Sequence, residues 1–122
     1  METHMIFETH AHYDDEAFDQ DREALLKSME AHGIGHIVNA CASIESLKAT
    51  EELMEKYPFV YGAFGIHPDD AEKMTEDTLN EIRRLCHLSK AVAIGEIGLD
   101  YYWHKEEREH EIQKKMFRAQ ME

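Results

Sequence analysis

Two histidines one residue apart, His10 and His12, follow an apolar run that begins at Met5. Side chains two apart on a strand point to the same side, so both imidazoles can reach one cation at about 2.0–2.1 Å. The same H-x-H pattern also occurs as two hydrogen-bonded loop histidines. Active sites of β/α barrels lie at the carboxyl ends of the strands, and at that position the pair predicts two metal ligands.

A carboxylate, Glu96, stands between Gly95 and Gly98 directly after the apolar run Ala91–Ile94. A carboxylate there is costly to desolvate unless it is paired or bound to metal. Its two oxygens can bridge two cations about 3.5–4 Å apart, so Glu96 is the predicted shared ligand of a two-metal site. The alternative is a salt-bridged or solvent-facing loop glutamate.

Three further residues are candidates around this centre. His67 precedes Pro68, which biases it away from helix and holds the imidazole in place; His67 can bind metal, donate to a phosphate oxygen or cap its loop. Asp100 is expected to accept a hydrogen bond from a ligating histidine. Tyr102, with its aromatic neighbours, is expected to line the cleft, to stack a base or to pack the following helix onto the sheet.

Five of the other histidines and a cluster of six acidic residues are expected on the surface. These are His4, His32, His36, His87 and His110, and an acidic face formed by Asp69, Asp70, Glu106, Glu107, Glu109 and Glu111. Cys41 and Cys86 lie far apart in different predicted elements, which indicates two buried thiols in a reducing cytoplasm rather than a disulfide.

The elements that must position these residues alternate between strand and helix. Apolar patterning predicts strands that begin near 5, 36, 59 and 91, and helices that begin at 14–15, 43, 75 and about 105. Alternation of this kind indicates parallel strands joined by crossover helices. Units of about 30 residues are those of a TIM-type (β/α)8 barrel, of which 122 residues hold four.

We therefore expect residues 1–122 to form the N-terminal half of one α/β barrel domain, truncated within its fourth helix. A flavodoxin-like open sheet is the rival architecture. That fold normally carries a glycine-rich turn after its first strand, and the corresponding segment here, residues 9–12, contains no glycine.

Charge restricts the partners that this chain can bind. It has 26 acidic and 13 basic residues, a formal net charge of −13, and no visible basic stripe. This composition disfavours coating of DNA or of an anionic membrane, so a phosphate must be held locally by metal cations. No apolar run is long enough for a membrane span, and the first residues lack a secretion signal, which predicts a cytoplasmic protein.

Three segments together resemble the TatD family of metal-dependent deoxyribonucleases, within the amidohydrolase-like barrels. They are Ile6–Tyr13, Gly65–Pro68 and Ala93–Tyr102. The resemblance implies a β/α barrel that hydrolyses DNA phosphodiesters with two divalent cations, among which Zn, Mn, Mg, Ni and Co are not distinguished. It implies that His10 and His12 are metal ligands, that Glu96 bridges the metals, that His67 contacts the substrate phosphate and that Asp100 lies just outside the ligands.

Family members are about twice as long, and their remaining ligands, two histidines and an aspartate, have no counterpart in this sequence. We expect the isolated chain to be an inactive fragment whose first and fourth strands are unpaired edges, completed by the missing C-terminal half or by another chain. Two other functions stay open: a metal-dependent amidohydrolase or esterase acting on a small substrate, and a non-catalytic metal-binding subunit.

Overall fold

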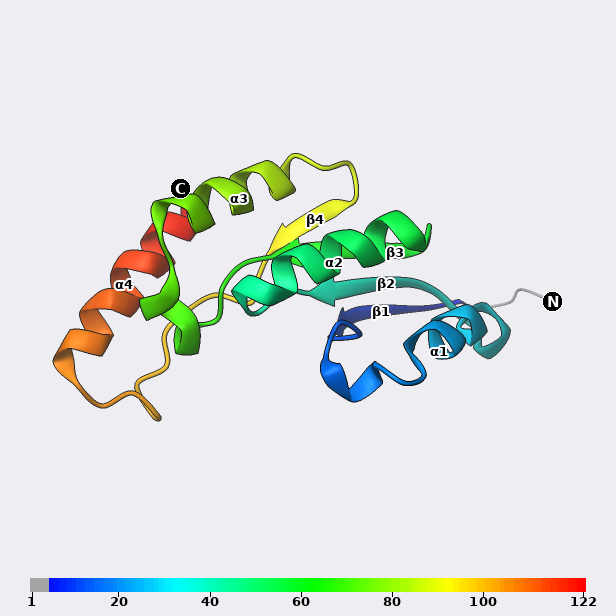
Figure 1. Cartoon of the computed structure of the whole chain (residues 1–122), viewed down its shortest axis with the longest axis horizontal. Coiled ribbons are helices and arrows are strands. Elements are labelled where there is room, and N and C mark those ends of the chain that lie inside the picture. Colours follow the sequence, from blue (N-terminus) through cyan, green and yellow to red (C-terminus); the bar gives the residue numbers. More distant parts are fainter. Residues whose placement is uncertain (1–4) are drawn as a thin grey trace.

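The computed structural model describes residues 5–122, so the expectation for His4 lies outside it. Strands and helices alternate along the chain (Figure 1). The elements are β1 Ile6–Ala11, η1 Glu16–Phe18, α1 Arg22–Ser28, η2 Glu30–His32, β2 Ile34–Ala40, α2 Ile44–Lys56, β3 Val60–Phe64, η3 Pro68–Lys73, α3 Glu76–Cys86, β4 Ala91–Ile94 and α4 Glu107–Met121, where η marks a 3-10 helix. Between residues 5 and 122, no helix has the length and apolarity that a membrane span requires.

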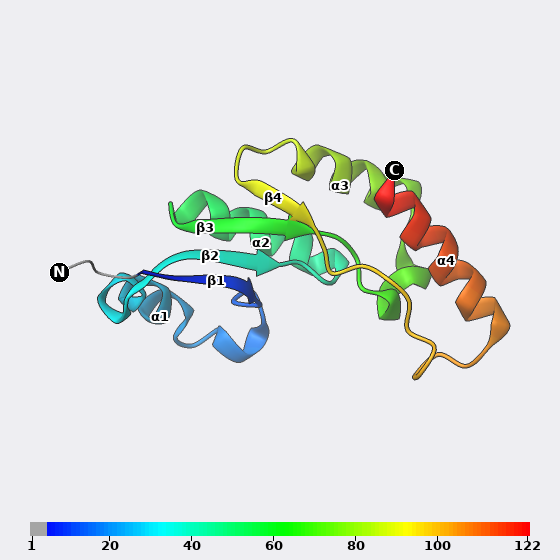
Figure 2. The same cartoon turned by 180° about the vertical axis from the view of Figure 1, so that it is seen from behind.

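The four strands form one parallel sheet in the order β1-β2-β3-β4. A flavodoxin-like sheet has the order 2-1-3-4-5, with its first strand inside the sheet; here β1 is an edge. Right-handed crossovers between sequential neighbours place the helices on one face. Accordingly, α2 lies in front of the sheet in Figure 1 and behind it in Figure 2. The winding is that of a β/α barrel.

The core lies between the sheet and these helices. Ile37, Phe64 and Leu85 have no exposed surface, and Leu26 has 1%; each such side chain contributes about 1.5–3 kcal/mol on burial. The helices α2 and α3 begin where predicted: the Oγ atoms of their N-cap residues, Ser43 and Thr75, accept backbone N–H groups three residues on.

The opposite face and both edges of the sheet expose large apolar side chains. Ile6 and Phe7 on β1 are 58% and 52% exposed, and Val92 and Ile94 on β4 are 53% and 43% exposed. No other described strand pairs with the outer edges of β1 and β4. The expectation of two open edges is confirmed for residues 5–122, and these edges also leave apolar side chains uncovered.

The helix predicted from residues 14–15 onward is wrong as a single element. The structure forms the short η1 and a separate α1 beginning at Arg22. Asp15 caps η1 by accepting the N–H of Ala17, and the Arg22 guanidinium bonds the carbonyl oxygens of Tyr13, Asp14 and Asp15. These bonds hold residues 13–15 in a loop where the apolar spacing indicated helix.

Smaller corrections concern β2 and the cysteines. β2 begins at Ile34, two residues before the predicted start. Gly33, just before β2, ends η2 with a left-handed φ of 80° that favours glycine. Cys41 is buried as expected, whereas Cys86 is only half-buried.

Candidate metal centre

Three side chains from distant parts of the sequence converge at the carboxyl ends of β1 and β4. Nε2 of His10 lies 3.2 Å from Nε2 of His12. The Glu96 Oε2 atom lies 3.5 Å from the first nitrogen and 3.4 Å from the second. Among residues 5–122, these three are the group of His, Cys, Asp or Glu side chains close enough to share a metal ion.

The chemistry and spacing of these atoms fit a divalent cation. Atoms bound to one tetrahedral cation at about 2.0–2.2 Å lie about 3.3–3.6 Å from one another, close to the three observed separations. Oε2 of Glu96 is buried and has no hydrogen-bond partner among the described residues, although the residue as a whole is partly exposed. A buried, unpaired carboxylate oxygen facing two imidazole nitrogens is stabilised when a cation lies between them.

The second nitrogen of His12 is already engaged, which sets its tautomer. Nδ1 lies 2.8 Å from the carbonyl oxygen of Ala40, at the end of β2. A carbonyl only accepts hydrogen bonds, so Nδ1 carries the proton and Nε2 presents a lone pair to Glu96. The orienting acceptor expected from Asp100 is therefore, for His12, a backbone carbonyl.

Glu96 is positioned by backbone hydrogen bonds to the end of β3 and to the residue that follows β2. Its N–H donates to the carbonyl oxygen of Cys41 at 3.1 Å, and the N–H of Gly95, joined to it by a cis peptide bond, donates to Phe64 at 3.2 Å. Gly65 passes so close that a Cβ atom added to it would lie 2.7 Å from the Gly95 carbonyl oxygen. The path of the chain into Glu96 thus depends on a glycine in the adjacent loop.

The loop after His12 is held by a buried amide that the sequence analysis did not identify. Asn39 has no exposed surface; its Oδ1 accepts the N–H of Tyr13, and its Nδ2 donates to Asp14 and Thr50. An asparagine inside the apolar strand 36–40 was the available signal, because a buried amide must be fully hydrogen-bonded.

His67 lies on the loop between β3 and η3, outside the three-residue group. The imidazole Nδ1 accepts the backbone N–H of Asp69 at 3.1 Å. The backbone N–H of His67 donates to the carbonyl oxygen of Ala42. A neutral ring that accepts at Nδ1 carries its proton on Nε2, so this atom is a hydrogen-bond donor. The side chain is 32% exposed. His67 therefore presents a fixed donor rather than a lone pair.

Neither Asp100 nor Tyr102 belongs to the three-residue group. The Asp100 carboxylate accepts the N–H groups of Tyr102 and Trp103 and so closes the turn that follows Glu96. Tyr102 is 70% exposed. Neither residue forms a hydrogen bond with His10 or His12 in the described part of the chain.

Two buried glutamines on α4, which the sequence analysis did not recognise as positioning groups, bind the loops that carry these residues. Gln113 accepts the N–H of Asp100 and donates to its carbonyl oxygen. Gln120 forms the same pair of bonds with Ile66, next to His67. The signal was their spacing of seven residues, which places both on one face of a helix.

His104 corrects the prediction of a wholly solvated acidic face. Its Nε2 lies 2.8 Å from Asp69 and its Nδ1 lies 3.2 Å from Glu109, so two of the supposed surface carboxylates hold one histidine. His110, also predicted on the surface, is half-buried: it stacks on Tyr101 at 3.7 Å and bonds the His104 carbonyl. The loop after β4 is thereby joined to η3 and α4.

His104 makes the free energy of unfolding depend on pH. Hydrogen bonds to Asp69 and then Glu109 raise the pKa of His104. Its contribution to the free energy of unfolding is therefore complete below the unfolded pKa of about 6.5 and is lost as pH rises through the raised value. We expect His104→Gln to destabilise the chain more at pH 6 than at pH 9, measured by urea unfolding in EDTA. Equal destabilisation at both pH values would contradict this assignment.

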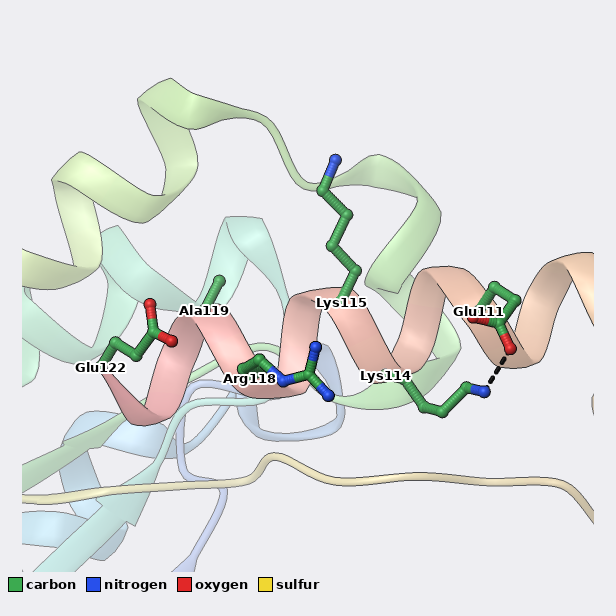
Figure 3. Close-up of a pocket in the computed structure, with 6 residues that line it drawn as sticks. All are labelled: Glu111, Lys114, Lys115, Arg118, Ala119 and Glu122. Atoms are coloured by element: carbon green, nitrogen blue, oxygen red, sulfur yellow. Dashed lines mark hydrogen bonds and ion pairs between the residues drawn. The ribbon is translucent and has the colours of Figure 1, made fainter.

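A separate hollow on α4 is lined by Glu111, Lys114, Lys115, Arg118, Ala119 and Glu122 (Figure 3). Its cations do not converge. Lys114 is paired with Glu111, and Lys115 points to the opposite side of the helix from Lys114 and Arg118. This surface lacks the clustered positive charge of a phosphate site.

A sequentially wound parallel sheet with two histidines and a carboxylate at its carboxyl ends is typical of metal-dependent hydrolases of the β/α-barrel class. The family model described as "TatD related DNase" matches residues 7–122, and the chain belongs to this TatD family.

Individual relatives agree with this assignment. The chain is 41% identical over 117 residues to the uncharacterized metal-dependent hydrolase YabD of Bacillus subtilis, covering 96% of this chain and 45% of YabD. It is 30% identical over 105 residues to a protein of Pantoea ananatis named 3'-5' ssDNA/RNA exonuclease TatD, covering 85% of this chain and 40% of that protein. The chain thus spans less than half the length of these relatives.

Solved structures show the same fold. The crystal structure of YjjV, a TatD homologue from Escherichia coli K12, superimposes with a TM-score of 0.82 at 30% identity over 98% of this chain and 46% of that one. A hydrolase of the TatD family from Entamoeba histolytica gives 0.81 at 25% identity, over 95% of this chain and 44% of that one. Residues 5–122 therefore form the first four β/α units of a TIM-type barrel.

Proposed function

We propose that this chain supplies the first part of a metal-dependent nuclease that hydrolyses phosphodiester bonds of DNA. The observation that carries the proposal is the convergence of His10, His12 and Glu96 around an unpaired, buried carboxylate oxygen. The TatD family assignment supports a metal-dependent hydrolase, and the exonuclease name of the Pantoea relative supports a nucleic-acid substrate.

Each residue has a distinct part in this proposal. His10 and His12 offer neutral nitrogen ligands, and Glu96 offers a carboxylate that two cations can share. A divalent cation bound here would supply a water of lowered pKa and neutralise charge on the phosphoryl oxygens. His67, with its proton on Nε2, donates to a non-bridging phosphate oxygen. Asp100 closes the turn that follows Glu96 and does not join the three-residue group.

The acidity of the chain fits local binding of the substrate. With a net charge of −13, long-range attraction cannot collect DNA on this surface, so the metal centre must provide the positive charge. Removal of the metal by EDTA should therefore abolish hydrolysis and also most phosphate binding at the centre.

The test compares the chain alone with a hybrid in which residues 7–122 replace the matching segment of the Bacillus YabD relative. With Mn²⁺, Zn²⁺ or Mg²⁺, we expect the hybrid to shorten an end-labelled single-stranded DNA, and the chain alone to be far slower because it carries only part of the centre. Glu96→Ala in the hybrid should reduce the rate at least about 100-fold, since a ligand shared by both cations is removed.

A second substrate separates the alternative hydrolase function. The same preparations are offered a small ester and a small amide, because a metal-activated hydroxide also attacks carbonyl carbon. A folded, metal-loaded hybrid that leaves DNA intact and hydrolyses the ester through Glu96 would replace the nuclease proposal with an esterase or amidohydrolase. Hydrolysis of neither would favour a non-catalytic metal-binding chain.

A further inference from the structure

The most exposed aromatic side chains of the described chain lie side by side on the loop between β4 and α4. Tyr102 is 70% exposed and Trp103 is 75% exposed. Their ring centroids are 4.7 Å apart with the planes at 89°, so each ring supports the other edge to face. This loop is the one that begins at Glu96, and its turn protrudes from the body of the chain (Figures 1 and 2).

Hydrogen bonds to the backbone hold Tyr102 and Trp103 in a fixed turn. The Asp100 carboxylate accepts the backbone N–H groups of both residues, and Gln113 binds the main chain of Asp100 on both sides. The preceding ring, Tyr101, stacks on His110. Rigid aromatic faces bind a planar ligand at lower entropic cost than mobile ones do, so the loop is a preorganised surface.

The loop also carries a positive charge suited to a phosphate next to a stacked ring. The Lys105 ammonium lies 4.9 Å from the centre of the Tyr102 ring. Trp103 lies seven positions after Glu96, so their Cα atoms are at most about 25 Å apart. One strand of nucleic acid can therefore contact the aromatic loop while its phosphate reaches the metal centre.

The exposed aliphatic residues have a different chemistry. Ile6, Val92 and Ile94 lie on the sheet itself and offer only apolar surface, as an interface with more protein requires. Tyr102 and Trp103 lie on the loop beyond the sheet, carry polar edges and are 70% and 75% exposed. These are the features of side chains on which bases stack.

We propose that Tyr102 and Trp103, on the loop that follows the metal ligand Glu96, form a stacking site for an unpaired nucleobase of a single-stranded nucleic acid. The inference rests on the proposed nuclease function, because it names the form of the substrate that this centre takes. Stacking tolerates any base, since every base has a π face, and so the site selects unpaired strands over duplex without reading sequence.

The experiment uses Trp103 as its own probe, because it is the only tryptophan of the chain. Emission of the 122-residue chain is titrated in EDTA with an octamer of dT and with an abasic octamer that has the same phosphates. We expect quenching by the dT octamer and about tenfold weaker binding of the abasic strand. With Lys105 as the main cation, the salt dependence should correspond to about one phosphate contact.

Two variants locate the effect. Tyr102→Ala should weaken dT binding about tenfold. Phe7→Ala, which removes a 52% exposed aromatic ring from β1, is the matched control and should leave binding unchanged. Trp103→Ala has no tryptophan emission, so its binding of the dT octamer is measured by the fluorescence anisotropy of a labelled octamer.

Equal binding of the dT and abasic strands, or no quenching at all, would overturn the stacking site. So would a Trp103 emission that shifts with protein concentration, tracks self-association by light scattering and is unaffected by DNA, since the loop would then be a protein contact. These titrations contain no metal and are therefore independent of the hydrolysis assay. A lack of DNA binding would not bear on metal-dependent hydrolysis, and a lack of hydrolysis would not change how the binding result is interpreted.

Discussion

Glu96→Gln is expected to lower the affinity of the chain for Zn²⁺ or Mn²⁺ at least about 100-fold, a larger loss than those typical of residues beyond the ligands. The substitution keeps the shape of the side chain and removes its charge. The variant amide also brings two N–H donors to a place where Nε2 of His12 presents a lone pair. Isothermal titration with each metal at pH 8 measures the change.

The same substitution should have the opposite effect on the stability of the metal-free chain. Oε2 of Glu96 is buried, lacks a hydrogen bond and faces two nitrogens at 3.4 and 3.5 Å. An amide N–H in its place donates to an imidazole lone pair, which should raise the free energy of unfolding in EDTA by about 1 kcal/mol. A functional site commonly shows this exchange of stability for binding.

Glu55→Gln is the matched control, because Glu55 is an exposed glutamate on α2 far along the chain from the centre. It removes the same charge and should change neither metal affinity nor stability. Unchanged metal affinity in Glu96→Gln would contradict the ligand assignment, and a loss of stability in EDTA would show that the carboxylate has another partner.

The parts of the fold that the sequence predicts are those set by local chemistry. Ser43 and Thr75 are strong N-cap residues followed by apolar stripes, so α2 and α3 begin where their caps place them. The short apolar runs of β2 and β3 alternate with these helices along the chain. This alternation predicts a parallel sheet, which the structure has.

The first loop could not be predicted in this way, because its structure depends on contacts between distant residues. Asn39 and Arg22 bind the backbone of residues 13–15 from two different elements. Apolar spacing reports which residues can share a helix face, but it does not report a guanidinium that captures three carbonyl oxygens. Tertiary hydrogen bonds therefore replaced the first turns of the predicted helix.

The candidate site also contains residues that the sequence predicts and residues that only tertiary contacts reveal. His10, His12 and Glu96 were identifiable because ligand types at strand ends have few purely structural roles. Gln113 and Gln120 were not, since a glutamine on a helix is ordinarily a surface residue, and only the loops that they bind make them positioning groups. The partner of His12, the Ala40 carbonyl, has no side-chain signal at all.

Gly65→Ala is expected to weaken metal binding at least about tenfold without altering any ligand, as a displaced supporting group does. A Cβ atom at this position would lie 2.7 Å from the carbonyl oxygen of Gly95 and 2.6 Å from a methyl carbon of Ile97. Gly95 is backbone and cannot rotate aside, so the segment that carries Glu96 must move. The overpacking should also cost about 1–3 kcal/mol of unfolding free energy, measured in urea with EDTA.

Gly95→Ala provides the steric control from the same turn, because a Cβ atom there meets nothing within 4 Å and the residue does not need a positive φ. It should retain the metal affinity of the unaltered chain. If Gly65→Ala lost stability but kept that affinity, the close approach would be a packing feature alone, and the position of Glu96 would not depend on it. Loss of affinity in Gly65→Ala with Gly95→Ala unaffected ties the geometry of the metal centre to one backbone contact between the loops after β3 and β4.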